Sequence, residues 1–418
     1  MTATRARGRH RSNRWTAIGA AAATAMALMW TAMGMPGWAN TSGGATSAAE
    51  AAASVKTAPI GAVACDGGKY GDGKVRYQPV YVYRAEAGPR KNGPATVRNV
   101  VWDVDQIFEA SAMRYPGFDA SRRPRIAQDA KCRPKVMSVA VKGLGAKHAM
   151  ADVRERATEA VRAQIGKGAE EWLGAHRMLL FYDTGEPDGC GTAATPTPDM
   201  RADKHGGWSE VSWDCAGASA MTHEMIHSFG VSHCDENKAQ GNDPICRGYD
   251  STPRCTGPRS GSVLDCERDD FHYFHPRPAK GSYLAKNPKQ NVANSPYLIR
   301  NKPAKPVAMR LADATSGKCL APARGGDRLR LATCGGDDQT WLRKINSRGY
   351  FTFKLGEKCL AKGKDGGAVL AKCANTAGQD WWQNESQGDA RNGYALVHSS
   401  GKEPITVDKA SVFVMRKG

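Results

Sequence analysis

Apolar and polar residues alternate with two different periods along the middle of the chain. Residues 78–83 (QPVYVY) and 177–182 (RMLLFY) are short runs rich in β-branched and aromatic side chains, which favour buried strands. Between residues 96 and 115, apolar side chains recur every three or four positions, which predicts a helix. The same criteria predict strands at 135–141 and 209–213 and a helix at 151–173. This alternation implies an α+β fold, a sheet with helices packed on it.

The first forty residues have the pattern of an export signal. Five arginines precede an apolar run from Trp15 to Met35, and Gly37 and Ala39 after Pro36 are small residues at the two positions that a signal peptidase reads. This layout is typical of a secretory signal peptide, which we place at residues 1–39. An uncleaved membrane anchor is the alternative, because about twenty apolar residues can span a bilayer. No later stretch is apolar enough to cross a membrane, so we expect a secreted, extracellular chain with no membrane partner after cleavage.

Two further segments contain few large apolar residues. Residues 40–64 consist mainly of Ala, Ser, Gly and Thr, so we expect a disordered leader or spacer there. Residues 184–205 are rich in Gly, Pro, Thr and Asp and predict a long surface loop. Globular structure is expected from residue 65.

Composition and charge narrow the range of functions. A chain of 418 residues is long enough for two folded units. The formal net charge is +18, or +13 without the five signal arginines. Lys and Arg are scattered and form no basic stripe with interleaved aromatics, so we expect no nucleic-acid partner. All twelve cysteines follow the signal segment, which in an exported protein predicts a disulfide framework, with Cys190 to Cys215 closing the 184–205 loop.

The chemistry is concentrated between residues 223 and 233, which read H-E-x-x-H-x-x-G-x-x-H. His223 and His227 are four apart, so on a helix both imidazoles face one ion. Gly230 permits the sharp turn that returns His233 as a third ligand. Three protein ligands leave a fourth position for water, as in catalytic zinc sites. Glu224, beside the first ligand, is expected to act as the catalytic base of amide hydrolysis, with protein or peptide as substrate.

Alternatives to this site are an ordinary amphipathic helix carrying histidines and a degenerate site that binds zinc without turnover. If His233 is not the third ligand, Cys234 and Asp235 are the nearest candidates, although a disulfide is favoured for Cys234. His272 and His275 have no spacing partner and are expected to be packing or surface residues.

These residues resemble the metzincin clan, and more narrowly a group of secreted bacterial metallopeptidase-like proteins. The resemblance covers residues 65–299, which it identifies as a zinc metallopeptidase domain with a mixed twisted sheet. It rests on the zinc motif and on four later segments: His233-Cys234-Asp235-Glu236, Asp243-Pro244-Ile245-Cys246, Val263-Leu264-Asp265-Cys266 and Gly281-Ser282-Tyr283-Leu284-Ala285.

The resemblance assigns further roles. Ile245 stands where metzincins have a methionine beneath the zinc, and its apolar side chain is expected to form the floor of the site. Arg247 stands where relatives often have Tyr, so Arg247 or Tyr249 is the candidate for transition-state assistance. Residues 209–213 look like the edge strand that aligns an extended substrate. Cys234 to Cys246 and Cys255 to Cys266 are expected disulfides, whereas Asp269 and Asp270 alone do not indicate a calcium site.

A repeat of about forty residues follows a proline-containing linker at 300–306. Each copy contains Cys-Leu, a second Cys and Gln-x-Trp, and the weaker third copy, from Tyr394 to Met415, lacks these features. The repeat resembles the ricin-B type β-trefoil lectin, which implies an all-β domain at 307–418 with disulfides Cys319 to Cys334 and Cys359 to Cys373. Where the family commonly has a sugar-binding Asp, this chain has Ala321 and Ala361, so a stabilising or protein-docking role is as well supported as carbohydrate or glycoprotein binding.

The sequence thus predicts an extracellular endopeptidase with one catalytic Zn²⁺ and a lectin-like targeting module. The alternative is a catalytically inactive scaffold with the same zinc site that binds surface glycans or proteins.

Overall fold

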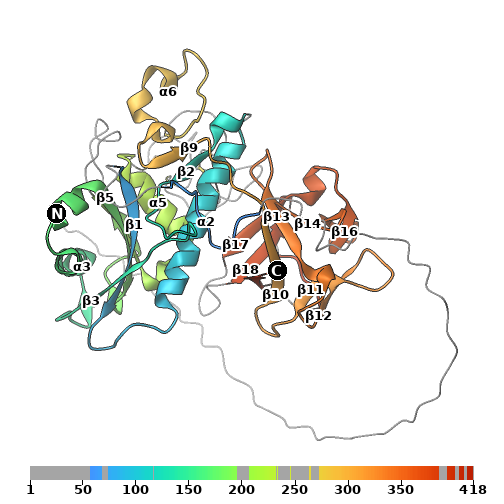
Figure 1. The fold of residues 1–418 in the computed structure, drawn as a ribbon, viewed down its shortest axis with the longest axis horizontal. Coiled ribbons are helices and arrows are strands. Elements are labelled where there is room, and N and C mark those ends of the chain that lie inside the picture. Colours follow the sequence, from blue (N-terminus) through green and yellow to red (C-terminus); the bar gives the residue numbers. More distant parts are fainter. Residues whose placement is uncertain are drawn as a thin grey trace, which may run out of the picture. The chain divides into compact units, whose positions relative to one another are not determined.

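The computed structural model describes residues 57–67, 74–115, 117–194, 207–231, 233, 245, 263–264, 273–385, 393–400, 404–408 and 412–417 (Figure 1). The predicted signal, residues 1–39, and most of the predicted leader lie outside these ranges. Among the helices in the described ranges, none combines the length and the apolar content that a bilayer span requires.

A five-stranded sheet forms the centre of the first part of the chain. Its spatial order is β3-β1-β5-β8-β7, and all neighbours run parallel except β7, which is antiparallel to β8. The bounds are β1 Arg76–Arg84, β3 Met137–Val141, β5 His176–Asp183, β7 Gly191–Ala193 and β8 Gly207–Ser212. The strand predicted at 209–213 therefore exists as β8 but is flanked on both sides. The correction is that, among the described strands, β7 and not β8 lies at this edge of the sheet, and β7 lies inside the predicted loop 184–205.

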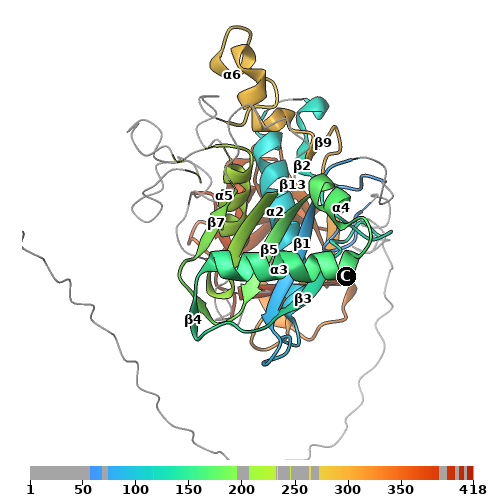
Figure 2. The same ribbon diagram turned by 90° about the vertical axis from the view of Figure 1, so that its left-hand side faces the viewer.

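Successive side chains of the strands point to opposite faces of this sheet, and each face packs in its own hydrophobic cluster. Val80, Val82 and Leu180 pack in one hydrophobic cluster with Val153 and Ala157 of helix α3, Met150–Ile165. Tyr77, Tyr81 and Phe181 point to the other face, where helices α2 (Gly93–Met113) and α5 (Ala218–Ser228) contribute to the second cluster. A period of two places successive residues on opposite faces, and residues 79–83 of β1 and 178–182 of β5 form uninterrupted apolar or aromatic runs because both faces are covered there. Figure 2 shows α3 lying across the sheet.

The helix predicted at 151–173 is two helices. It is interrupted between α3 and α4 (Ala169–Ala175) at Gly166 and Gly168, whose φ angles are 69° and 89°. Glycine adopts this left-handed conformation at little cost, and it ends the helix there.

Short elements complete the first part. β2 (Arg122–Pro124) pairs with β9 (Leu298–Arg300), and β4 (Lys147–His148) pairs with β6 (Glu186–Pro187). Helix α6 spans Tyr283–Lys286. Single 3-10 turns occupy Phe118–Ala120, Trp213–Cys215, Pro288–Gln290 and Val292–Asn294.

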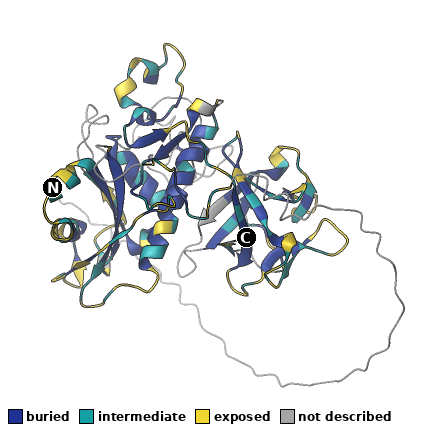
Figure 3. Cartoon of the chain, viewed as in Figure 1, coloured by how far each residue is buried: buried dark blue, intermediate teal, exposed yellow. Residues whose placement is uncertain are grey.

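Residues 307–417 contain strands and 3-10 turns. Six strands pair in a closed ring, β10-β13-β14-β17-β18-β19 and back to β10, and two hairpins, β11-β12 and β15-β16, extend from it. Figure 3 shows buried residues along the strands of this barrel-like part. The bounds are β10 Val307–Asp313, β11 Cys319–Pro322, β12 Leu329–Ala332, β13 Trp341–Ile345, β14 Phe351–Leu355, β15 Lys358–Lys362, β16 Ala368–Lys372, β17 Trp381–Glu385, β18 Gly393–His398 and β19 Val412–Lys417, with 3-10 turns at Asp337–Gln339 and Ala377–Gln379.

The end of the predicted leader is folded. Ala62, Val63 and Ala64 are buried, and the Ala64 N–H donates to Asp105 of α2. Small apolar residues suffice here because the neighbouring disulfide, Cys65 to Cys132, fixes the segment against the rest of the domain. The disorder predicted from low apolar content is therefore wrong for residues 57–64.

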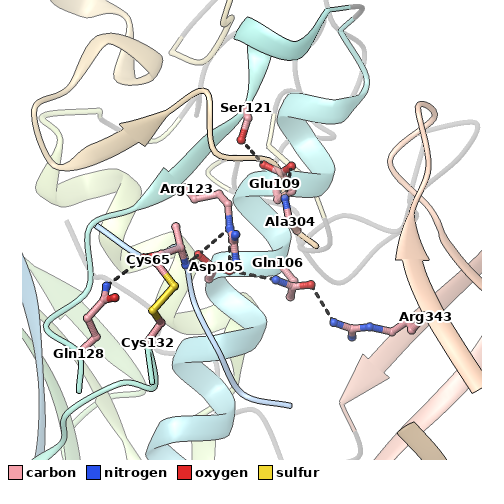
Figure 4. Close-up of polar contacts among 11 residues, drawn as sticks. Cys65, Asp105, Gln106, Glu109, Ser121, Arg123, Gln128, Cys132, Ala304 and Arg343 are labelled. Atoms are coloured by element: carbon pink, nitrogen blue, oxygen red, sulfur yellow. Dashed lines mark hydrogen bonds and ion pairs between the residues drawn. A yellow bond between two sulfur atoms is a disulfide. The ribbon is translucent and has the colours of Figure 1, made fainter. Parts of the chain in front are cut away.

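Helix α2 carries a buried network of polar side chains (Figure 4). Asp105 accepts hydrogen bonds from Arg123 and from the side chain of Gln106. The side-chain Oε1 of Gln106 accepts from Arg343 of β13 at 2.8 Å, and that guanidinium also lies 4.5 Å from the ring centroid of Trp102. The network therefore joins α2 to the barrel-like part through paired groups.

Candidate metal centre

Helix α5 places the first half of the zinc motif. Met221, Met225 and Ile226 are fully buried in the core between α5 and the sheet. His223 and His227, on another side of the same helix, are half-buried. Ser209 of β8 donates a hydrogen bond to the backbone carbonyl of Glu224 at 3.2 Å, which ties this part of the helix to the sheet.

A turn after α5 brings back the third histidine. The helix ends at Ser228, and Gly230 has a φ of 83°, in the left-handed region that favours glycine. The Gly230 N–H donates to the carbonyl of His227 at 2.7 Å, which closes the turn. The chain reverses here, as the motif predicts, and His233 lies beside the helix.

The three imidazoles meet at their Nε2 atoms. The distance is 3.2 Å between His227 and His223, 3.1 Å between His227 and His233, and 3.1 Å between His223 and His233. In the described part of the chain, these residues are the one group of three or more His, Cys, Asp or Glu side chains with a spacing suited to a metal ion.

The protonation of His227 agrees with a ligand role. Its Nδ1 lies 2.8 Å from the carbonyl oxygen of Val231, which accepts hydrogen bonds only, so Nδ1 carries the proton and Nε2 presents a lone pair. Burial lowers the pKa of His227 to about 4, which keeps the ring neutral. The Val231 carbonyl is a backbone group, so no residue type in the sequence identifies it.

The triangle fits a zinc ion. Two nitrogen ligands of a tetrahedral zinc at about 2.0 Å from the metal lie about 3.3 Å apart. The three observed separations are close to this value, and a neutral ring with its lone pair turned inward is the form that binds metal.

Glu224 follows His223 in α5 and is not part of the triangle. Its side chain is buried, and its Oε2 has no hydrogen-bond partner among the described residues. Burial, and secondly the nearby carboxylate of Glu210, raises the pKa of Glu224 to about 7. A buried carboxylate with a free oxygen and a raised pKa is suited to accepting a proton near neutral pH.

The structure joins the predicted pair Cys190 and Cys215, next to β7. Ile245 is buried in the same core cluster as Met221 and Met225 of α5. His275 packs on Tyr115 with a ring-centroid distance of 4.1 Å, in line with a packing role. Other predicted residues lie outside the described ranges: Arg247, Tyr249, His272, Cys234, Cys246, Cys255 and Cys266.

In the barrel-like part, both copies of the repeat form the same hydrogen bonds. The indole N–H of Trp341 donates to the Leu320 carbonyl at 3.1 Å, and that of Trp381 donates to the Leu360 carbonyl at 3.0 Å. The disulfides Cys319 to Cys334 and Cys359 to Cys373 are present.

The positions where ricin-B type lectins commonly have a sugar-binding Asp lie in the interior of this part. Ala321 is completely buried and Ala361 is 6% exposed. Neither side chain carries a hydrogen-bonding group, so these two positions offer no side-chain contact to a sugar.

Comparison with known proteins gives no family. No family model matches the sequence, and no curated protein matches it. Among solved structures, the GlcNAcα1-4Gal-releasing endo-β-galactosidase from Clostridium perfringens matches at 15% identity with a TM-score of 0.22, over 27% of this chain and 29% of that chain. SeviL bound to the asialo-GM1 saccharide matches at 15% identity and a TM-score of 0.20, over 27% of this chain and 97% of that one. A chaperone–substrate complex matches at 12% identity and a TM-score of 0.27, over 54% and 35%. These scores are too low to assign a fold or function, which therefore rests on the residues of this chain.

Proposed function

We propose that this chain is a secreted zinc-dependent endopeptidase whose barrel-like part directs it to a carbohydrate or glycoprotein surface. The observation that supports the enzymatic proposal is the triangle of Nε2 atoms of His223, His227 and His233, with separations of 3.1 to 3.2 Å beside the buried Glu224. The four disulfides among the described residues support export to an oxidising compartment.

The three histidines would hold the ion. Bound zinc would supply a hydroxide near neutral pH, by lowering the pKa of water to about 7, and would polarise the scissile carbonyl. Glu224 would accept the proton of the attacking water, for which its unpartnered Oε2 is available. The same carboxyl group would then donate that proton to the departing amine. Hydrolysis would proceed without a covalent intermediate.

The edge strand β7 would bind the substrate. It lies next to α5 and has a neighbour, β8, on one side among the described strands. An extended peptide can add to such an edge through backbone hydrogen bonds, largely independently of its side chains. Its small residues, Gly191, Thr192 and Ala193, leave room for a second backbone.

Two measurements on the mature chain test the proposal. Elemental analysis of chelator-free protein should give one zinc per chain, and His233→Ala should lose it, whereas His275→Ala, outside the triangle, should keep it. Casein or gelatin should be cleaved, and a chelator should abolish the cleavage. Glu224→Gln should keep zinc but lose about 10²-fold or more in turnover. The control is Glu171→Gln, which removes an exposed carboxylate of α4.

Contrary results would be decisive. Correctly folded protein without zinc would exclude the metal centre. Bound zinc with no chelator-sensitive cleavage of any protein would exclude the enzyme and leave a zinc-containing scaffold that binds surface glycans or proteins.

The targeting role has its own test. The repeated Trp contacts and paired disulfides build a rigid strand-rich body, but Ala321 and Ala361 contribute no sugar contact, so any sugar site must use other residues. The inactive Glu224→Gln chain should be retained on a polysaccharide or glycoprotein resin and released by free sugar. Retention by protein alone would show a docking role instead.

A further inference from the structure

Edge strand β7 passes directly over the carboxylate of Glu224. A Cβ atom built on Gly191 would lie 2.6 Å from Glu224 Oε1 and 3.0 Å from Glu224 Cδ. It would also lie 3.0 Å from the backbone carbonyl oxygen of Glu210 in β8. Carbon atoms in favourable contact with their neighbours are about 3.5 to 4.0 Å apart. The space that any side chain at position 191 would need is therefore occupied by Glu224.

Backbone conformation does not explain this glycine. The φ of Gly191 is not in the left-handed region. A residue with a side chain could therefore adopt the local backbone, and contact with Glu224 and β8 is the feature that requires glycine.

The strand has little freedom to move away. Gly191 is paired with Val211 in β8, and the Ser212 N–H donates to the Cys190 carbonyl at 2.8 Å. A disulfide joins Cys190, the preceding residue, to Cys215. The Glu210 carbonyl belongs to the sheet backbone and is equally fixed. A side chain at position 191 would thus displace the carboxylate of Glu224, which is the one partner in the contact free to rotate.

We propose that Gly191 is a positioning residue: its bare Cα allows the Glu224 carboxylate to lie against β7 with one oxygen free for proton transfer. This inference rests on the proposed function for its catalytic consequence. Misplacing a catalytic group by about 1 Å is enough to cost on the order of 10²-fold in rate.

The test compares two glycine variants on neighbouring strands. Gly191→Ala should lower kcat by about 10-fold to 10²-fold, with a smaller change in KM and one zinc per chain retained. The matched control is Gly207→Ala in β8, whose Cβ would meet only Ala194 Cβ at 3.8 Å and Arg177 Cγ at 3.9 Å, which are ordinary contacts. Its kcat should equal that of the wild type. Wild-type kcat in Gly191→Ala would overturn the inference while leaving the enzyme proposal intact.

A second measurement does not depend on catalysis. Thermal unfolding is followed for Gly191→Ala in the wild-type chain and in the Glu224→Ala chain, where the carboxylate is absent. The substitution should lower Tm in the first background and lower it less in the second, and it should not slow Glu224→Ala further. An equal loss of Tm in both backgrounds would show that a side chain at position 191 does not meet the Glu224 carboxylate. If the wild type cleaves nothing, the proposed function fails, and this cycle still decides whether Gly191 holds the carboxylate.

Discussion

Two clusters of polar side chains, one at α2 and one at α5, differ in their hydrogen bonding. Along α2, Asp105, Gln106 and Arg343 are joined in a continuous hydrogen-bonded chain. In α5, Glu224 Oε2 and Thr222 Oγ1 have no hydrogen-bond partner among the described residues, and the Nε2 atoms of His223, His227 and His233 lie 3.1 to 3.2 Å from one another.

The difference distinguishes side chains that stabilise the fold from side chains that are available for chemistry. Burying a polar group costs free energy unless it is hydrogen-bonded, so nearly all buried groups are paired. A buried group left without a hydrogen-bond partner calls for an explanation, and one explanation is a ligand, an ion or a water molecule that completes the site. Asp105, Gln106 and Arg343 are hydrogen-bonded to one another and stabilise the fold, whereas the proposed zinc ion and a water molecule would complete the α5 cluster.

The largest effect is expected on the paired side of this comparison. Asp105 is fully buried against Arg123, so Asp105→Ala leaves a buried cation without its partner and should lower the free energy of unfolding by about 3–5 kcal/mol. Urea unfolding measures this. The control is Asp129→Ala, which breaks the exposed ion pair with Arg133 and should cost about 0–1 kcal/mol. Equal losses in the two variants would contradict the distinction.

A smaller effect is expected at the α5 cluster. Adding zinc to the metal-free chain should raise the free energy of unfolding by about 2.7 kcal/mol at a zinc concentration of about 100 times Kd, because the folded triangle binds the ion and the unfolded chain does not. The same titration of His233→Ala should give little stabilisation. A similar rise in both chains would place the metal elsewhere.

The smallest effect concerns the charge on Glu109 in α2. Glu109 accepts hydrogen bonds from Ser121 at 2.7 Å and from the Ala304 N–H at 2.9 Å, and burial raises its pKa. As the pH rises, the unfolded chain therefore loses this proton first, and the free energy of unfolding falls until the folded pKa has been passed. Glu109→Gln keeps the geometry and cannot ionise.

The comparison with this variant gives the sign of the effect. Relative to Glu109→Gln, the wild type should be equally stable below the unfolded pKa of Glu109 and progressively less stable as the pH rises through the folded pKa. Urea unfolding of both chains across this range measures the difference. A difference that is independent of pH would show that Glu109 does not titrate with a raised pKa.

The sequence predicts the helix and turn of the candidate site well, because each depends on local spacing. His223, Glu224 and His227 follow from helical periodicity, and Gly230 follows from the backbone that a sharp turn requires. The repeat of Cys and Gln-x-Trp likewise predicts the strand-rich part, since both copies form the same hydrogen bonds.

Long-range contacts are not encoded in any local pattern. Gly191 lies in a segment whose Gly, Pro and Thr content predicts a loop, and its proposed role depends on contact with Glu224, which is distant in sequence. The Val231 carbonyl that orients His227 is a backbone group, which every residue provides. A glycine next to a disulfide-bonded cysteine is the only local signal that could have directed attention to β7.

The short segment before Cys65 sets a limit on maturation by proteolysis. The Ala58 N–H donates to the Pro306 carbonyl at 2.8 Å, and Ala62, Val63 and Ala64 are buried beside α2. Trimming that stops before residue 57 removes none of these contacts. A processing enzyme that cut at residue 64 would uncover apolar surface and detach the start of β10 from its neighbour, so the mature N-terminus is expected upstream of Ala58.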